Sequence, residues 1–347
     1  MRKFFLVTAL FLSLCLGAQP VWANQAVAFS TQFADIENHS WGAADMKKMV
    51  QLGILLGYPE GDKYYARPDQ LISRAEFAAL LARTLGMGDG SQAPPFTDWQ
   101  AVPDWARGPV ASLHSAGIVQ GSPNKDGTFS FQPSKNISRA EIVTMLTKAL
   151  TAQPGLPETN PFNDVQEGQW FYQAVLKAHL LGIVNGRTAD AFVPNGTATR
   201  VETFAMLARF LDKDAGVLPR EEDLAALVAE FEEKVKDAMN GGDKQVLANY
   251  LTGEAELALK KGGAGIWESV PSGGKVAVSY PEGPPVVEAK SSRLAQLKYT
   301  LEVKITASSG TQPAEVTTRV SGRYGLQKIG EAWKIYVIDV SLLETSA

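Results

Sequence analysis

Cysteine is almost absent from this chain of 347 residues, and histidine is scarce. Cys15 is the single cysteine, so neither a disulfide framework nor a cysteine-based zinc site can be built. Three histidines, spaced far apart between residues 39 and 179, argue against a histidine metal site or catalytic base. We expect no metal and no cofactor, and we interpret the histidines as helix-surface or interface residues: His39, His114 and His179.

A strong charge of either sign is also missing. Lysine and arginine total 33 against 37 aspartates and glutamates, which gives a net charge of -4. This balance provides no general attraction to nucleic acid or to an anionic lipid surface, so any anion must be bound by a local arrangement. Apolar residues make up 45% and charged residues 20%, as in ordinary folded domains, and the length indicates two or three of them.

Long hydrophobic runs are absent except at the N-terminus. Arg2 and Lys3 precede the apolar run 4–16, and small residues follow, as in a secretory signal peptide. The run is shorter than the ~20 residues of a membrane span, which disfavours the alternative of an anchor. Lipid attachment at Cys15 is disfavoured because Leu14 precedes it. We expect export, cleavage after Ala23 (or after Ala28) and no membrane insertion afterwards.

Residues 33–212 repeat one pattern three times. Each copy opens with Phe-x-Asp, and a tryptophan follows the aspartate by six or seven residues. The tryptophan precedes a Gly-Ile pair by 12 residues, and a second glycine comes four later. An aromatic residue, a proline and Ser/Thr-Arg-x-Glu close the copy. The motif residues are Phe33, Asp35, Trp41, Gly53, Gly57, Tyr65, Pro68, Ser73, Arg74 and Glu76; Phe96, Asp98, Trp105, Gly117, Gly121, Phe131, Pro133, Ser138, Arg139 and Glu141; Phe162, Asp164, Trp170, Gly182, Gly186, Phe192, Pro194, Thr199, Arg200 and Glu202.

The spacing predicts a helix, a loop and a second helix in each copy. The segment from the tryptophan to Gly-Ile spans about three helical turns, with glycine where a helix stops. Ser/Thr followed three residues later by glutamate is a capping box that starts the second helix. Because a helix pair this short buries its apolar face poorly alone, we expect the three copies to share one core.

This motif series resembles the S-layer homology (SLH) domain, present as the usual triplet. The resemblance covers about half of the chain and implies a pseudo-threefold helical bundle that holds an exported protein non-covalently on the bacterial cell wall. The partner it implies is a secondary wall polysaccharide, commonly pyruvylated. Tyr65 in place of phenylalanine, Val201 in place of alanine and a short third loop depart from the pattern, which puts equal binding by all three grooves in doubt.

The repeated residues also suit an acidic sugar chemically. An arginine one residue into a helix faces the positive end of the helix dipole, which suggests that an anion is expected there. A guanidinium grips a carboxylate through two parallel hydrogen bonds, indoles offer flat faces to sugar C–H groups, and glycines allow close approach. The predicted polysaccharide-binding residues are Arg74, Arg139, Arg200, Trp41, Trp105, Trp170, Gly57, Gly121, Gly186, Asp35, Asp98 and Asp164.

Purely structural interpretations compete with this one. The arginines can pair with carboxylates of a neighbouring repeat, and the aspartates suit turns or helix caps better than ligand contacts. The tryptophans can pack in the core, contact ligand, or do both. The phenylalanines are expected in the core and the glutamates in capping boxes.

After residue 212 the repeat ends and a different pattern begins. Residues 221–239 and 244–261 read as helices, and alternating strands are expected at 275–280, 296–306, 315–327 and 332–342. This order is similar to the cone-shaped nuclear-transport-factor-two-like superfamily. The predicted organisation is a signal peptide 1–23, a spacer 24–32, SLH repeats 33–87, 96–151 and 162–212, a linker 213–220, and a C-terminal α+β domain 221–347 with a curved antiparallel sheet.

Two functional hypotheses follow. The favoured one is a non-enzymatic cell-envelope or S-layer protein, whose repeats bind the wall polymer and whose C-terminal domain is an interaction or assembly module for an envelope partner. The alternative is a wall-tethered enzyme or small-ligand receptor with its pocket in the C-terminal domain. That domain has no histidine or cysteine. Glu254 and Glu256 are expected on a solvated helix face, which leaves Asp339 as the interior acid candidate, although the alternation of the strand could equally turn it outward.

Overall fold

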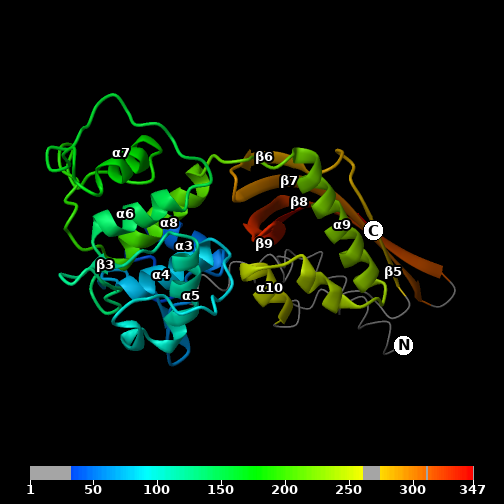
Figure 1. Ribbon diagram of the computed structural model, residues 1–347. Coiled ribbons are helices and arrows are strands. Elements are labelled where there is room, and N and C mark those ends of the chain that lie inside the picture. The colour runs from blue at the N-terminus through cyan, green and yellow to red at the C-terminus, as the bar shows by residue number, and fades with distance from the viewer. Residues whose placement is uncertain (1–32, 261–273, 310–311, 347) are drawn as a thin grey trace.

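The computed structural model of the chain describes residues 33–260, 274–309 and 312–346. The predicted signal peptide, its cleavage site and the spacer lie outside the described residues. Helix pairs fill one side of the molecule, and a sheet with α9 (Glu221–Met239) lies on the other side (Figure 1). Helices together with an antiparallel sheet confirm the mixed helical and α+β fold class in its coarse form.

Each repeat contributes two helices, as the spacing predicts. Ser73, Ser138 and Thr199 each cap the second helix of their repeat, with the glutamate three residues later completing the capping box. The loops of the first two repeats contain short hairpins that the sequence pattern did not predict, β1 (Tyr58–Glu60) with β2 (Lys63–Tyr65) and β3 (Ser122–Pro123) with β4 (Phe129–Ser130). The helix pairs are α3 (Ala43–Gln51) and α4 (Arg74–Thr84), α5 (Asp104–Ser115) and α6 (Arg139–Lys148), and α7 (Tyr172–Leu180) and α8 (Arg200–Lys213).

Backbone hydrogen bonds connect the repeats in a cycle. The N–H of Ile72 donates to Ala198, that of Ala198 to Ile137, and that of Ile137 back to Ile72. The first residue of each second helix also donates to the next repeat, the third repeat donating to the first: Arg74 to Lys135, Arg139 to Gly196, and Arg200 to Gln70. One continuous apolar core includes residues of all three repeats. Each repeat therefore completes the packing of the other two.

The C-terminal part consists of helices followed by a five-stranded antiparallel sheet. Its second predicted helix is divided into η2 (Lys244–Asn249) and α10 (Gly253–Lys260). In the sheet β7 (Leu294–Ser309), β8 (Gln312–Ile329) and β9 (Ala332–Ser346) are adjacent. Two shorter strands pair with different halves of β7: β5 (Lys275–Ser279), which was predicted, and β6 (Val286–Lys290), which was not.

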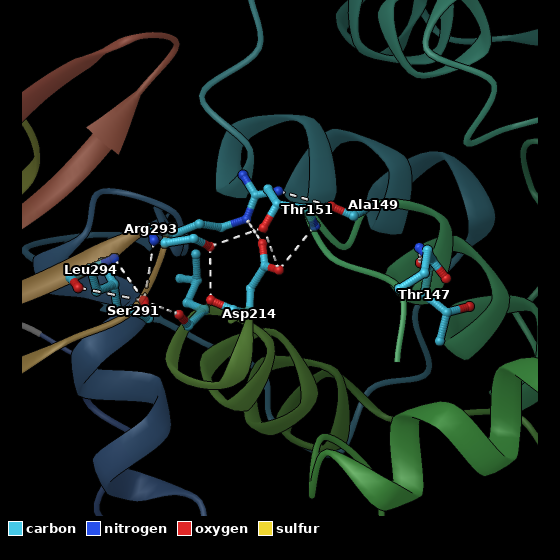
Figure 2. Close-up of polar contacts among 10 residues, drawn as sticks. Thr147, Ala149, Thr151, Asp214, Ser291, Arg293 and Leu294 are labelled. Carbon is cyan, nitrogen blue, oxygen red and sulfur yellow. Dashed lines mark hydrogen bonds and ion pairs between the residues drawn. The ribbon is translucent and has the colours of Figure 1, made fainter. Parts of the chain in front are cut away.

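The two parts of the chain meet in a buried polar joint (Figure 2). Asp214 is fully buried and forms an ion pair with Arg293, with 2.6 Å between Oδ2 and Nε. Arg293 also donates from Nη2 to the carbonyl of Ala149, and the hydroxyl of Thr151 donates to Asp214 Oδ1. Leu294 extends into the core of the repeats. Within the predicted linker, Asp214 is thus a buried contact between the two parts.

Candidate ligand-binding site

The capping-box arginines lie inside the protein. Arg74, Arg139 and Arg200 are 3%, 6% and 5% exposed. Each donates from Nε to a backbone carbonyl of the next repeat, at Phe131, Phe192 and Ala66 respectively, over 2.7 to 3.0 Å. The same contact between neighbouring repeats therefore occurs three times around the cycle.

Two of the three arginines form ion pairs within the protein. Arg74 pairs with Glu141 at 3.1 Å and Arg200 with Glu76 at 3.8 Å, so a capping-box glutamate of the neighbouring repeat neutralises each of these two cations. Burial lowers the pKa of all three arginines, and the charge of a capping-box glutamate partly offsets this in each case. The charge argument for a ligand at Arg74 and Arg200 therefore loses its basis, and contact of these arginines with sugar stays a prediction.

The three Phe-x-Asp aspartates hold strained backbone in place. Asp98 accepts hydrogen bonds from the N–H groups of Phe131 and Gln132, both at 2.7 Å, and Asp35 and Asp164 bind the equivalent pairs. The second donor of each pair has a left-handed backbone, with φ of 52°, 59° and 60° at Arg67, Gln132 and Val193. Such a conformation is costly for these residue types. The structure gives the aspartates this turn-stabilising role, and a ligand contact by them stays a prediction.

The second glycine of each repeat accommodates the repeat's own phenylalanine. A Cβ on Gly57, Gly121 or Gly186 would lie within 2.5 to 2.7 Å of the ring of Phe33, Phe96 or Phe162. Each of these rings is buried. The close approach predicted for a ligand is therefore already made by an aromatic side chain of the core.

The tryptophans, in contrast, are open to solvent. Trp41 and Trp105 are each 57% exposed, and Trp170 is 64% exposed. Each indole therefore presents a large flat apolar face that a ligand can reach. Of the predicted ligand-contacting residues, these three have the most available surface.

One cavity brings together a tryptophan, an arginine and a glycine of the predicted set, each from a different repeat. It has a volume of about 340 Å³ and lies beside Trp41 of the first repeat, Arg139 of the second and Gly186 of the third. The sequence argument grouped the three residue types within one repeat, whereas the cyclic packing combines them across repeats. Third-repeat residues complete the lining, among them Arg187, Glu202 and Arg209.

Arg209 is the cation in this cavity that sequence reasoning missed. Arg187 pairs with Glu202 at 3.2 Å, but within the described part of the chain no hydrogen bond or salt bridge engages Arg209. A cation recurs nine residues after each capping-box arginine, which is the signal that could have revealed it. The equivalent cations of the other two repeats are hydrogen-bonded within the protein: Arg83 donates to the carbonyl of Ile54, and Lys148 donates to Gln120.

A second cavity of about 420 Å³ lies on the first repeat. Its lining includes Asp35, Arg67 and a contact of 3.1 Å between His39 and Asp69. Asp35 is already engaged by backbone N–H groups, and Arg67 pairs with Glu60. Among the described residues, no group of three or more histidines, cysteines or acids could hold a metal ion.

In the C-terminal part, one expectation about acids is wrong and one open alternative is decided. Glu254, expected on a solvated face, is 3% exposed, and burial with the nearby charge of Asp339 raises its pKa to about 8. Asp339, the interior candidate, is on the surface opposite Arg323 in the sheet. Glu256 does lie near solvent, paired with Lys260 at 2.6 Å. Sequence reasoning missed Glu232, which is 7% exposed and whose pKa burial raises to about 8.

Three helix pairs closed into a cycle, with a cavity where the repeats meet, define a repeat module joined to an α+β domain. The S-layer homology domain model matches residues 32–78, 95–143 and 161–203. The chain therefore carries three S-layer homology domains, as the motif spacing predicted.

Similar proteins include surface proteins and enzymes. The middle cell wall protein of Brevibacillus brevis is 34% identical over 179 residues, which are 49% of this chain and 15% of that protein. The S-layer protein of Bacillus thuringiensis subsp. finitimus is 28% identical over 197 residues, 56% of this chain and 23% of that protein. An endoglucanase of Bacillus sp. is 28% identical over 215 residues, 60% of this chain and 22% of the enzyme. The chain thus matches less than a quarter of each of these relatives.

The three domains and these relatives support a cell-surface, cell-wall-associated location. Because the relatives include both surface proteins and glycosidases, the shared repeats do not decide between an anchor and an enzyme. None of the helices in the described segments is long and apolar enough to cross a membrane.

Proposed function

We propose that this protein is a cell-envelope protein held non-covalently on the bacterial cell wall, and that its cavity at Trp41 and Arg209 binds an acidic sugar of a secondary wall polysaccharide. The observation that carries the proposal is an exposed indole and an unpaired guanidinium on one cavity. A guanidinium binds a carboxylate through two parallel hydrogen bonds, and an indole packs on sugar C–H groups. A pyruvyl ketal presents such a carboxylate on a sugar ring.

The cyclic hydrogen bonds support a pseudo-threefold bundle with three related grooves. By this symmetry a second groove combines Trp105 with Arg200 and residues of the first repeat. The third groove combines Trp170 with Arg74 and residues of the second repeat. The cations equivalent to Arg209 in these grooves donate to the protein itself. Among the described residues, Arg209 is thus the one of these three cations whose N–H groups make no hydrogen bond to the protein, which favours the groove at Trp41 for an anion.

Retention on isolated cell walls tests the proposal. Arg209→Ala should weaken retention by about 10- to 100-fold, since hydrogen bonds to charged groups contribute roughly 1.5 to 3 kcal/mol. Trp41→Ala should also weaken retention, because it removes the apolar face on which the sugar packs. Arg220→Ala is the matched control, because Arg220 is an exposed arginine paired only with Asp223. Walls chemically stripped of pyruvate should retain little wild-type protein. Full retention of both groove variants would overturn the proposal.

For the C-terminal domain we propose an interaction or assembly module with a cone-like sheet. The second candidate is a receptor or enzyme, which buried polar atoms favour: Oε1 of Glu232 and the hydroxyl of Tyr280 have no hydrogen-bond partner among the residues that the structure describes. Glu232 also raises the pKa of Tyr280, so the two groups are near one another. Native mass spectrometry of the purified protein distinguishes the candidates: a bound small molecule that Glu232→Gln releases supports the receptor.

A further inference from the structure

The cavity at Trp41 has two walls that belong to different repeats. Trp41 lies just before α3, and Ala205, Met206 and Arg209 lie on α8. The two helices pack together, and Lys48 of α3 pairs with Asp212 near the end of α8 at 2.5 Å. The width of the cavity therefore depends on how α3 is held against α8.

The C-terminal domain contacts the far end of α3. Gly253, at the start of α10, approaches so closely that a Cβ there would lie 2.3 Å from the carbonyl oxygen of Gln51. On the other side of this contact, a Cβ on Gly53 would lie 3.1 Å from Cα of Gly253. At the equivalent glycines of the other repeats, Gly117 and Gly182, no atom of the described residues lies within 4 Å of that position. The C-terminal domain thus covers this helix end in the first repeat and leaves the equivalent sites open.

The same domain also holds the end of α8. The hydroxyl of Ser291 donates to the carbonyl of Leu211, and both the N–H and the hydroxyl of Ser292 donate to the carbonyl of Asp214. Arg293 completes this joint through the buried carboxylate of Asp214 (Figure 2). These carbonyls are the unsatisfied acceptors that a helix end leaves, so the joint fixes the last turn of α8.

The other two grooves lack this support on one side. Their tryptophans lie on α5 and just before α7, which pack on α4 and α6. In the described segments, no hydrogen bond or ion pair links α5 or α7 to the C-terminal domain. In those grooves the described part of the C-terminal domain contacts the end of the second helix, near Gly86 and at Ala149.

We propose that the C-terminal domain braces the groove at Trp41 by gripping α3 and α8 together, which makes this groove the tightest of the three for the wall glycan. The inference rests on the proposed function, because it presumes that the groove binds acidic sugar. Gly253 and Arg293 do not line the cavity, so they act as positioning residues that hold α3 and α8. A preformed groove loses less entropy on binding than one that must be ordered by its ligand.

Gly253→Ala tests the brace without changing the groove. The added Cβ should push α10 away from α3. Wall retention should weaken by about fivefold to tenfold, which is a coupling typical between packed sites. Amide hydrogen exchange should become faster in α3 and α8 but not in α5 and α7. Gly241→Ala is the matched control, because Gly241 also has a positive φ but nothing within 4 Å. Adding Trp41→Ala to Gly253→Ala should cost less retention than Trp41→Ala costs alone.

Two outcomes overturn the inference: faster exchange in α3 and α8 with undiminished retention, or unchanged exchange in both helices. Arg293→Lys tests the brace in a second way. Lysine keeps the positive charge but lacks the forked guanidinium that reaches both Asp214 and Ala149. If Trp41→Ala leaves retention intact, the proposed function fails. The exchange pattern of Gly253→Ala still reports on the brace in that case.

Discussion

A guanidinium at the start of a helix requires an anion nearby, and here the neighbouring repeat supplies it. Arg74 and Glu141 illustrate the arrangement: the glutamate caps its own helix and also pairs with the arginine of the preceding repeat. The Ser/Thr-Arg-x-Glu motif therefore encodes the closure of the cycle as well as helix starts. The sequence predicted the capping boxes because a cap depends on residues three apart. It could not choose the partner of the arginine, which lies far along the chain.

Replacing Arg74 by alanine should destabilise the repeats. It leaves Glu141 and the carbonyl of Phe131 without their cation, at a cost of about 3 to 5 kcal/mol for a broken buried pair. Urea unfolding monitored by circular dichroism measures the loss, with Arg220→Ala as the exposed control. Unaltered stability together with lost wall retention would show that Arg74 serves the ligand instead.

Asp98→Ala should also destabilise the fold. The change removes two charge-assisted hydrogen bonds that hold Gln132 at a φ of 59°, worth about 2 to 4 kcal/mol together. Adding Gln132→Gly should recover part of the loss, because glycine adopts this conformation without strain. Thermal unfolding of the single and double variants measures both effects. A double variant no more stable than Asp98→Ala would refute the strain argument.

At the scale of elements, periodicity located the long segments and missed features that depend on packing. The helix α9 begins and ends where the amphipathic stripe does, at Glu221 and Met239. The strand β6 was missed because its exposed residues give no clear alternation. Glu254 was misplaced because its burial arises from α3 and β9 packing on α10, which a local pattern does not contain.

Buried acids on the helices make stability depend on pH. Burial raises the pKa of Glu232 to about 8, so the folded state holds a proton that the unfolded state releases above about pH 4.5. The stabilisation is complete below that pH and is lost as the pH rises through 8. Between pH 6 and pH 9 the free energy of unfolding should fall, by about 2 to 3 kcal/mol from this group.

Glu232→Gln removes the titrating group and keeps the shape of the side chain. In this variant the fall in the free energy of unfolding between pH 6 and pH 9 should be about 2 to 3 kcal/mol smaller than in the wild type. Glu254, whose pKa is raised to about 8, should account for much of the fall that remains. Urea unfolding at the two pH values measures it, with Glu256→Gln as the control on α10. An equal fall in the wild type and in Glu232→Gln would mean that Glu232 is already ionised at neutral pH.

At the scale of the whole molecule, the two parts of the chain form one packed unit. Composition and the end of the repeat placed the boundary near residue 213, but the sequence did not reveal that Asp214 is a buried contact across it. A polar residue after a helix reads as linker unless its partner is known, and Arg293 lies 79 residues away. Inter-domain contacts of this kind depend on tertiary packing alone.

Differential scanning calorimetry should show one cooperative transition for the intact chain, because the joint couples the two parts. Arg293→Ala leaves the carboxylate of Asp214 buried without its cation, at a cost of about 3 to 5 kcal/mol, and should separate the transition into two. Lys298→Ala, an exposed change on the adjoining strand β7, is the control and should keep one transition. Two transitions in the wild type would mean that the parts unfold independently.

The central claim is that an acidic sugar is held by Arg209 in the groove at Trp41. Titration calorimetry with purified wall polysaccharide, before and after removal of its pyruvyl groups, tests it most directly when run on the wild type and on Arg209→Ala. Wild-type affinity should fall at least about tenfold on removal, and the variant should show little further change. An equal fall in both proteins would place the carboxylate elsewhere, and no fall in the wild type would contradict recognition of the acid altogether.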